Sequence, residues 1–243
     1  MFSDIITVAQ KELKEILLQR GSMRGGLMNL LIVLAIIGIL FPLDSGPEWL
    51  SSPTSLITMI WLPLLMSMGL ITDSFAGERE RHTLETLLAT RLSDQAILFG
   101  KITASMTYAM GLAIVGGLLG AVTVNVQYPG AGFYSPSLLA GMLIFGVLGS
   151  LLVSAMGVLV SLHAENVRQA YQRMSIGYLA LVLPLAFAPR FLPRDIQLQI
   201  AQWLNGLDLM QAAAAAAGGL ALVNAALLVL CMARFQRARL IAD

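Results

Sequence analysis

The sequence contains few charged residues and few of the side chains that carry out chemistry. Lys, Arg, Asp and Glu make up 12% of its 243 residues, whereas soluble domains carry about 25%. The single cysteine, Cys231, lies in an apolar run, which excludes an intrachain disulfide framework. The formal net charge is +1, so the composition does not indicate a nucleic-acid partner.

Catalytic and nucleotide-binding motifs are also absent from the sequence. Its two histidines, His82 and His163, are not part of an H-E-x-x-H motif or a cysteine–histidine cluster, and no G-x-S-x-G elbow occurs. Gly100-Lys101 does not end an ATP-binding loop, because Gln95 occupies the position of that motif's first glycine. We therefore expect neither an enzyme nor a chain that binds a cofactor or metal itself.

Apolar residues make up 57% of the chain and are grouped into long runs separated by short polar loops. A helix needs about 20 residues to cross the hydrocarbon core of a bilayer. The pattern predicts an all-α integral membrane protein with six transmembrane helices. The fifth run is short, so its helix is expected to begin earlier, around Gln169–Ser175. The candidate spans are Gly25–Phe41, Ser55–Ile71, Ile102–Val124, Ser137–Leu162, Ile176–Ala188 and Ala212–Ala233.

Charge placement predicts the orientation of these spans. With six spans, both termini lie on the same side as the second and fourth loops. All Lys and Arg residues except Arg190 and Arg194 fall in those segments. Because cytoplasmic segments are enriched in Lys and Arg, we expect a multi-pass plasma-membrane protein with both termini in the cytoplasm. No charged residue lies deep within a span, which argues against a proton-driven carrier.

Two segments outside the spans have the periodicity of amphipathic helices. Ser3–Arg20 combines an apolar stripe with basic residues just before the first span, which indicates a helix along the cytoplasmic membrane surface. It is either a simple anchor or an elbow that transmits motion, and surface affinity alone explains the pattern. Arg190–Gln211 is a second such segment, on the outer side, and an interfacial helix anchored by Trp203 explains it.

The most informative stretch is the charged island Glu78–Lys101, ERERHTLETLLATRLSDQAILFGK, between the second and third apolar runs. Its charge excludes it from lipid, so it must form a structured cytoplasmic loop. Leucines at helical spacing give one apolar stripe, and Ser93 is placed as the N-cap of a following helix. We therefore expect two helices here. A solvated loop helix explains the charges, but charges beside a leucine stripe also suit docking to a protein.

This island resembles the hallmark loop of ABC-transporter permeases of the type-2 exporter family. In that family a pattern near E-x-E-x-G-T-L-E-x-L-L-x-T-P-x-S, ending in G-K, follows the second span. The chain has His82 where the family usually has glycine, and Arg91 where it usually has proline. The six-span layout and the N-terminal amphipathic helix extend the resemblance over essentially the whole chain. The matching residues are Glu78, Glu80, Thr83, Leu84, Glu85, Leu87, Leu88, Thr90, Ser93, Gly100 and Lys101.

The resemblance implies a dimer of permease subunits, identical or paralogous, in which each subunit binds a cytoplasmic ATP-binding subunit that holds ATP and Mg. It implies that the loop after the second span is a coupling helix seated against that ATPase. It also implies that the outer amphipathic segment is a re-entrant helix capping the exit. The residues expected at the ATPase-coupling interface are Glu78, Arg79, Glu80, Arg81, Thr83, Leu84, Glu85, Leu87, Leu88 and Arg91.

Three residues within the spans are further candidates. Asn224 is the most deeply placed strongly polar side chain. It either lines a pathway or joins helices by hydrogen bonds, and the second reading is the simpler one. Pro63 and Pro184 interrupt the second and fifth spans, and each is either a hinge or a static packing feature.

We therefore predict a single transmembrane domain over residues 1–243, embedded in the lipid bilayer, that serves as the permease subunit of an ATP-driven exporter. The alternative is a membrane channel or scaffold that needs no ATPase. The expected parts are the cytoplasmic amphipathic helix (1–24), the first two spans (25–75), the coupling segment (76–100), spans three to five (101–189), the outer amphipathic helix (190–211), and the sixth span with its basic tail (212–243).

Overall fold

Helices make up all the regular structure in residues 1–18, 23–206 and 208–235, the parts of the chain that the computed structural model describes. The predicted all-α class is confirmed. The elements are α1 (Phe2–Leu18), α2 (Met23–Ala35), the π-helix η1 (Ile36–Leu40), α3 (Phe41–Ser45), the 3₁₀-helix η2 (Gly46–Leu50), α4 (Pro53–Glu80), α5 (Leu84–Leu88), α6 (Asp94–Gln127), α7 (Pro136–Leu162), α8 (Val167–Phe191), α9 (Arg194–Asn205) and α10 (Leu209–Arg234).

Five helical stretches among these residues are long and apolar enough to cross a membrane, so the chain is a multi-pass membrane protein. The predicted fifth span falls in α8, which is not one of the five. α8 begins at Val167, just before the early start that its short apolar run suggested. The six-span count stays a prediction. The five stretches are Leu30–Leu50, Pro53–Glu80, Asp94–Gln127, Pro136–Leu162 and Met210–Arg234.

Small polar residues set the starts of the long helices. The predicted N-cap is confirmed, since Ser93 Oγ accepts a hydrogen bond from the Ala96 amide at 3.2 Å and α6 begins at the next residue. Ser135 and Asn166 cap α7 and α8 in the same way. Each cap satisfies an amide that has no partner within its own helix.

The second long helix, α4, extends further than its sequence predicted. That span was expected to end at Ile71, with the charges from Glu78 onward in a separate helix. α4 instead continues to Glu80, and only α5 is a separate short helix. The expected boundary was wrong because the charged side chains at the end of α4 find partners on neighbouring helices, which allows the helix to continue.

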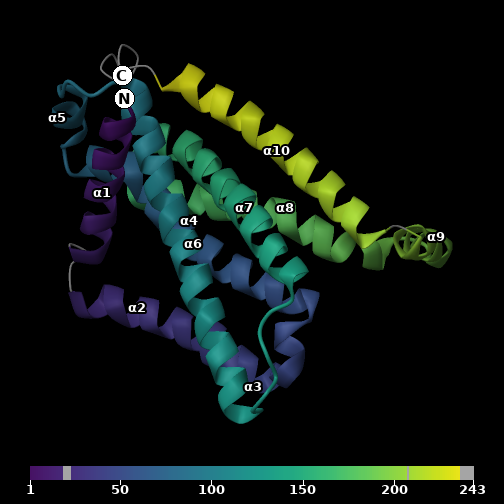
Figure 1. The fold of residues 1–243 in the computed structure, drawn as a ribbon. Coiled ribbons are helices and arrows are strands. Elements are labelled where there is room, and N and C mark those ends of the chain that lie inside the picture. The colour runs from purple at the N-terminus through teal and green to yellow at the C-terminus, as the bar shows by residue number, and fades with distance from the viewer. Residues whose placement is uncertain (19–22, 207, 236–243) are drawn as a thin grey trace.

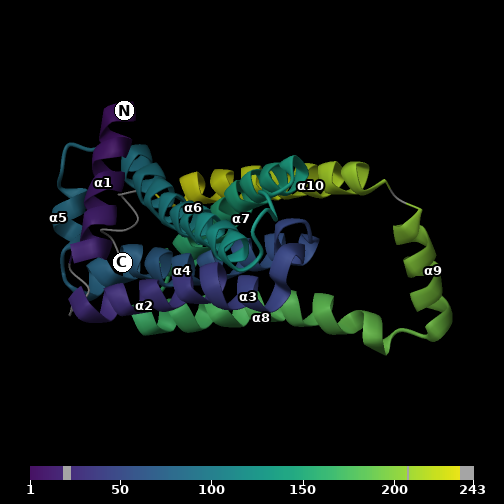
Figure 2. The same cartoon turned by 60° about the horizontal axis from the view of Figure 1, so that its bottom comes forward.

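The bundle is built around α4, α6 and α7, with α10 packed along α7 (Figure 1). Asn224 Nδ2 donates to the Leu148 carbonyl at 2.9 Å, and two turns further along both helices Cys231 Sγ donates to the Ala155 carbonyl at 3.3 Å. α10 therefore runs in the same direction as α7. α9 lies at the end of the molecule remote from α1 and α5 in both views (Figures 1 and 2).

Candidate functional site at the end of α4

The charged end of α4 is a meeting point for helices that are far apart in the sequence. α1, α5, the start of α6 and the turn between α7 and α8 all gather at this end of the bundle (Figure 1). We call this region the α4 junction. It consists of Glu78, Arg79, Glu80 and Arg81 with the groups that they contact.

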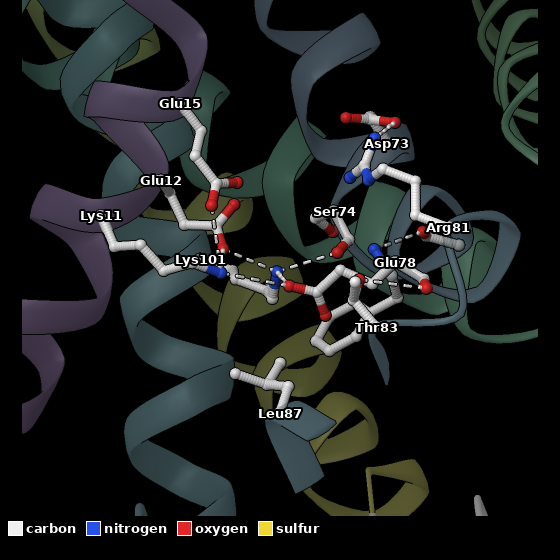
Figure 3. A network of polar contacts seen from close by, with 12 residues as sticks. Lys11, Glu12, Glu15, Asp73, Ser74, Glu78, Arg81, Thr83, Leu87 and Lys101 are labelled. Carbon is white, nitrogen blue, oxygen red and sulfur yellow. Dashed lines mark hydrogen bonds and ion pairs between the residues drawn. The ribbon is translucent and has the colours of Figure 1, made fainter. Parts of the chain in front are cut away.

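At the centre of the α4 junction lies Lys101 of α6, whose side chain is 1% exposed. Its Nζ donates to Glu12 Oε1 of α1 at 2.8 Å and to Glu78 Oε1 of α4 at 3.0 Å (Figure 3). A third hydrogen bond runs to the Ser74 carbonyl at 2.8 Å, so every ammonium proton has an acceptor. Nζ also lies 5.1 Å from the centre of the Phe75 ring. Since a buried charge is tolerated only when paired and hydrogen-bonded, Lys101 holds α1, α4 and α6 together.

Gly100 explains how α1 comes close enough for this contact. A Cβ at position 100 would lie 2.5 Å from Cβ of Val8 and 3.2 Å from the Ile5 carbonyl oxygen. Glycine therefore allows α1 to lie directly on α6. Val8 and Glu12 are one turn apart on α1, so the contact at Gly100 places the Glu12 carboxylate beside Lys101. The Gly-Lys pair of the sequence pattern thus acts as one structural unit.

Lys11 adds a second cation at the edge of the α4 junction. Its Nζ lies 3.3 Å from Glu15 Oε1 and 3.6 Å from Glu78 Oε1. Burial by itself would lower the pKa of Lys11, but the carboxylates of Glu12, Glu78 and Glu15 raise it above its usual value. Lys11 therefore stays charged near Glu78. The second oxygen of Glu78, Oε2, is buried without a hydrogen-bond partner among the described residues.

On the other side of α4, Arg79 and Glu80 reach the turn between α7 and α8. Arg79 donates from Nη2 to the Leu162 carbonyl at 3.1 Å and from Nη1 to the Ala164 carbonyl. Glu80 Oε2 accepts a hydrogen bond from the amide of Val167, the first residue of α8, at 3.2 Å. Of three consecutive side chains of α4, Glu78 therefore contacts α1 and α6, Arg79 contacts the end of α7, and Glu80 contacts the start of α8.

The end of α4 is a Schellman motif with His82 in the left-handed conformation, at φ 56°. The His82 amide donates to the Arg79 carbonyl at 3.1 Å, and the Thr83 amide donates to the Glu78 carbonyl at 2.8 Å. A positive φ favours glycine, which has no Cβ to clash with the backbone. A glycine would suit this position, as the family pattern has it, and this chain forms the turn with His82.

α5 is fixed to the bundle by leucines and carries polar residues beside it. Leu84 is 8% exposed, and Leu87 is partly buried against the same cluster, which includes Phe75 and Ile97. The apolar stripe predicted from the leucine spacing therefore faces inward at these two positions. The side chain of Leu88 lies outside the described residues.

The predicted coupling residues other than the leucines fall into two groups. Glu78 is 5% exposed and so is closed off from a partner protein in this structure, and Arg79 is partly buried with its guanidinium against α7. The second group is exposed at the surface and consists of Glu80, Arg81, Thr83, Glu85 and Arg91.

The candidates within the spans lie away from the α4 junction. Asn224 is buried and donates a hydrogen bond from Nδ2 to the Leu148 carbonyl of α7. Its Oδ1 is buried with no hydrogen-bond partner in the described part of the chain. α4 runs unbroken through the buried Pro63, and α8 continues through Pro184, whose side chain lies outside the described residues.

Sequence reasoning assigned no role to Glu12, Lys101 or Ser161. Glu12 carried a weak signal, an acidic residue on the flank of the apolar stripe of α1, and Lys101 carried one as part of the matched pattern. Ser161 carried none, since it is one of several serines in an apolar run. Its Oγ accepts from the Phe75 and Ala76 amides, at 3.2 Å and 2.9 Å, and donates to the α4 backbone.

A multi-pass helical protein with a fixed polar loop and no ATP-binding motif fits the membrane permease class of transport proteins. The chain belongs to the ABC-2 type transporter family, because the model of that family matches residues 3–228. It is thus the membrane permease component of such a transporter and not itself an ATPase. The family resemblance seen in the charged island is confirmed.

The chain is also similar to an individual permease, the ABC transporter permease protein NatB of Bacillus subtilis (strain 168). The two are 29% identical over 142 residues. The match covers 55% of this chain and 37% of NatB, so the chain spans well under half of the relative's length.

Proposed function

We propose that this chain is the membrane subunit of an ATP-driven exporter and works with a separate cytoplasmic ATP-binding subunit, which holds ATP and Mg. Two permease subunits, identical or paralogous, form the translocation pathway in the plasma membrane. Membership of the ABC-2 family supports the ATP-binding partner. The export direction follows from the resemblance of the charged island to the exporter loop. Family membership also weighs against a channel or scaffold that works without an ATPase.

The observation that best supports this proposal is a polar surface next to α5 that rests on a rigid base. We call Arg81, Thr83, Glu85 and Arg91 the docking surface, since all are exposed. Beneath them Leu84 and Leu87 pack into the apolar cluster. An ATP-binding subunit seated here would push on α5 and, through the three residues Arg81–Thr83, on the end of α4.

Helix directions support the six-span topology of this proposal. α7 and α10 run in the same direction, as the contacts of Asn224 and Cys231 with α7 show. α7 and α10 can cross the membrane in the same direction only if the chain crosses it in the opposite direction between them. α8 is the long helix between α7 and α10. α1 and the end of α10 also lie at one face, since the ring centroids of Phe235 and Phe75 are 5.1 Å apart beside the α4 junction. With the bias in basic residues, that face is the cytoplasmic one.

The movement then follows from the contacts. ATP binding draws the two ATP-binding subunits together, and each moves the α5 that it holds. Because the α4 junction links α4 to α1, α6, α7 and α8, the displacement tilts several spans at once and opens the pathway outward. Asn224, Pro63 and Pro184 remain candidates for pathway and hinge positions on these spans.

Charge reversal on the docking surface tests this function. The double variant Glu85→Lys with Arg91→Glu should lose association with the ATP-binding subunit when the two are co-expressed and purified together. Asp195→Lys, an exposed reversal on α9 at the remote end, is the matched control and should keep it. Equal association of the two variants would remove the docking surface from the proposal.

A further inference from the structure

We infer that Arg79 and Glu80 are positioning residues that make the turn between α7 and α8 move with the end of α4. This inference rests on the proposed function, because it concerns how a displacement of α5 reaches α8. It assigns to Glu80 a contact inside the permease, where the sequence pattern suggested a contact with the ATPase.

Arg79 is matched to the end of α7. The last carbonyl groups of a helix lack partners and carry a partial negative charge. The guanidinium of Arg79 donates to two carbonyls there, Leu162 at 3.1 Å and Ala164. A planar guanidinium can hold two acceptors in a fixed geometry, which a single ammonium cannot do as well.

Glu80 is matched to the start of α8, where the charge is of the opposite sign. The first amide groups of a helix lack partners and carry a partial positive charge. Glu80 Oε2 accepts from the Val167 amide at 3.2 Å, while the Asn166 side chain accepts from the Gln169 amide. Neighbouring residues of opposite charge on α4 thus face the oppositely charged ends of two consecutive helices. The order of the two charges therefore matters, and exchanging them would place each against a like charge.

Packing beneath these charges leaves little room for sliding. Ala76 of α4, Ala164 of the turn and Ala170 of α8 are each 0% exposed and form one small cluster. Ser161 of α7 bonds to the α4 backbone at the same level, donating to the Thr72 carbonyl at 2.8 Å. Small side chains allow the backbones to approach closely. The end of α4 and the α7–α8 turn therefore form one rigid body, which passes a displacement of α5 directly to α8.

The test compares Glu80→Gln with Glu80→Ala. A glutamine oxygen still accepts from the Val167 amide, whereas alanine offers no acceptor. A cysteine at the exposed position Gln172 of α8 reports movement through its labelling rate with a membrane-impermeant maleimide. Cys231 is buried, which keeps background labelling low. The full chain is measured in membranes, alone and with the ATP-binding subunit, with and without ATP.

We expect Glu80→Gln to keep the wild-type labelling rate and its response to ATP. Glu80→Ala should raise the labelling rate several-fold in the chain alone and weaken the change in that rate on adding ATP. Association with the ATP-binding subunit should persist. The exchange Arg79→Glu with Glu80→Arg should raise the rate most. For contrast, Glu85 lies on the docking surface, so Glu85→Gln and Glu85→Ala should both weaken association and leave the rate in the chain alone unchanged.

Two results would overturn the inference. One is equal loss of association in Glu80→Gln and Glu80→Ala, which would make Glu80 a charged contact with the partner. The other is a wild-type labelling rate in the exchanged variant, which would show that the charges do not position α8. Failure of the wild-type chain to associate with an ATP-binding subunit would refute the proposed function alone, since the labelling of the isolated chain still decides whether Glu80 positions α8.

Discussion

Lys101 and Glu78 form a buried ion pair, with Nζ 3.0 Å from Oε1 and side chains 1% and 6% exposed. The pair joins the start of α6 to the end of α4, and Glu12 extends it to α1. Breaking a buried pair on one side leaves a charge without compensation, which is more damaging than removing both partners. The stability of the α4 junction therefore depends on Lys101 more than on any exposed charge around it.

Lys101→Met should lower the free energy of unfolding by about 3 kcal/mol, because it removes the ammonium that compensates the buried carboxylate of Glu78 and the partly buried one of Glu12. Adding Glu78→Gln should recover part of that loss. Lys11→Met is the matched control, since Lys11 is half-exposed and its pairs are worth less than about 1 kcal/mol. Denaturant titration in detergent measures the free energy of unfolding of all three variants. Similar losses at Lys101 and Lys11 would mean that the buried pair has no special weight.

His82→Gly should leave stability unchanged or raise it by up to about 1 kcal/mol. The left-handed conformation costs a non-glycine residue about 1–2 kcal/mol, and glycine's extra unfolded-state entropy offsets about 0.5–1 kcal/mol of the gain. The other histidine is the control, because His163 ends α7 with φ at −108°. His163→Gly should destabilise the protein. Thermal unfolding of the two variants measures both changes in stability. If His82→Gly destabilised the protein as much as His163→Gly, the left-handed turn at His82 would be contradicted.

Gly100→Ala should lower stability by about 1–3 kcal/mol, the usual effect of overpacking, because the new Cβ would meet Val8. Gly111 is the control in the same helix, where an added Cβ has nothing within 4 Å. Gly111→Ala should raise stability by about 0.5–1 kcal/mol through helix propensity alone. The measurement is the free energy of unfolding of each variant.

A second substitution separates the contact from any other effect of Gly100→Ala. Val8→Gly removes both side-chain carbons that would lie closest to the new Cβ, so Gly100→Ala should cost much less stability in that background than in the wild-type chain. Additive losses in the double variant would show that α1 does not rest on α6 at this point.

The sequence was informative wherever local chemistry decides structure. Ser93 could be placed as a cap because a hydroxyl before a helical run has few other uses, and the structure confirms its bond to Ala96. The inward position of Leu84 followed in the same way from helical spacing. The membrane class followed from long apolar runs in which charges are absent.

The partners of charged residues could not be read in this way. The family resemblance implied that Glu78 faces a partner protein, and charged side chains are exposed by default. It is buried because Lys101 lies beside it, and because Glycine at position 100 brings Glu12 of α1 to the same place. These contacts join residues that are far apart in the chain, and helical periodicity within one segment contains no information about them. The contacts of Arg79 and Glu80 with the α7–α8 turn could not be predicted for the same reason.

The central claim is that this permease works with a separate ATP-binding subunit. The most direct test is affinity purification of the full chain from its native membrane in mild detergent, followed by mass spectrometry of the proteins present in stoichiometric amount. We predict recovery of a soluble ATP-binding protein at one copy per permease chain. Recovery of the chain alone across several gentle detergents would contradict the claim.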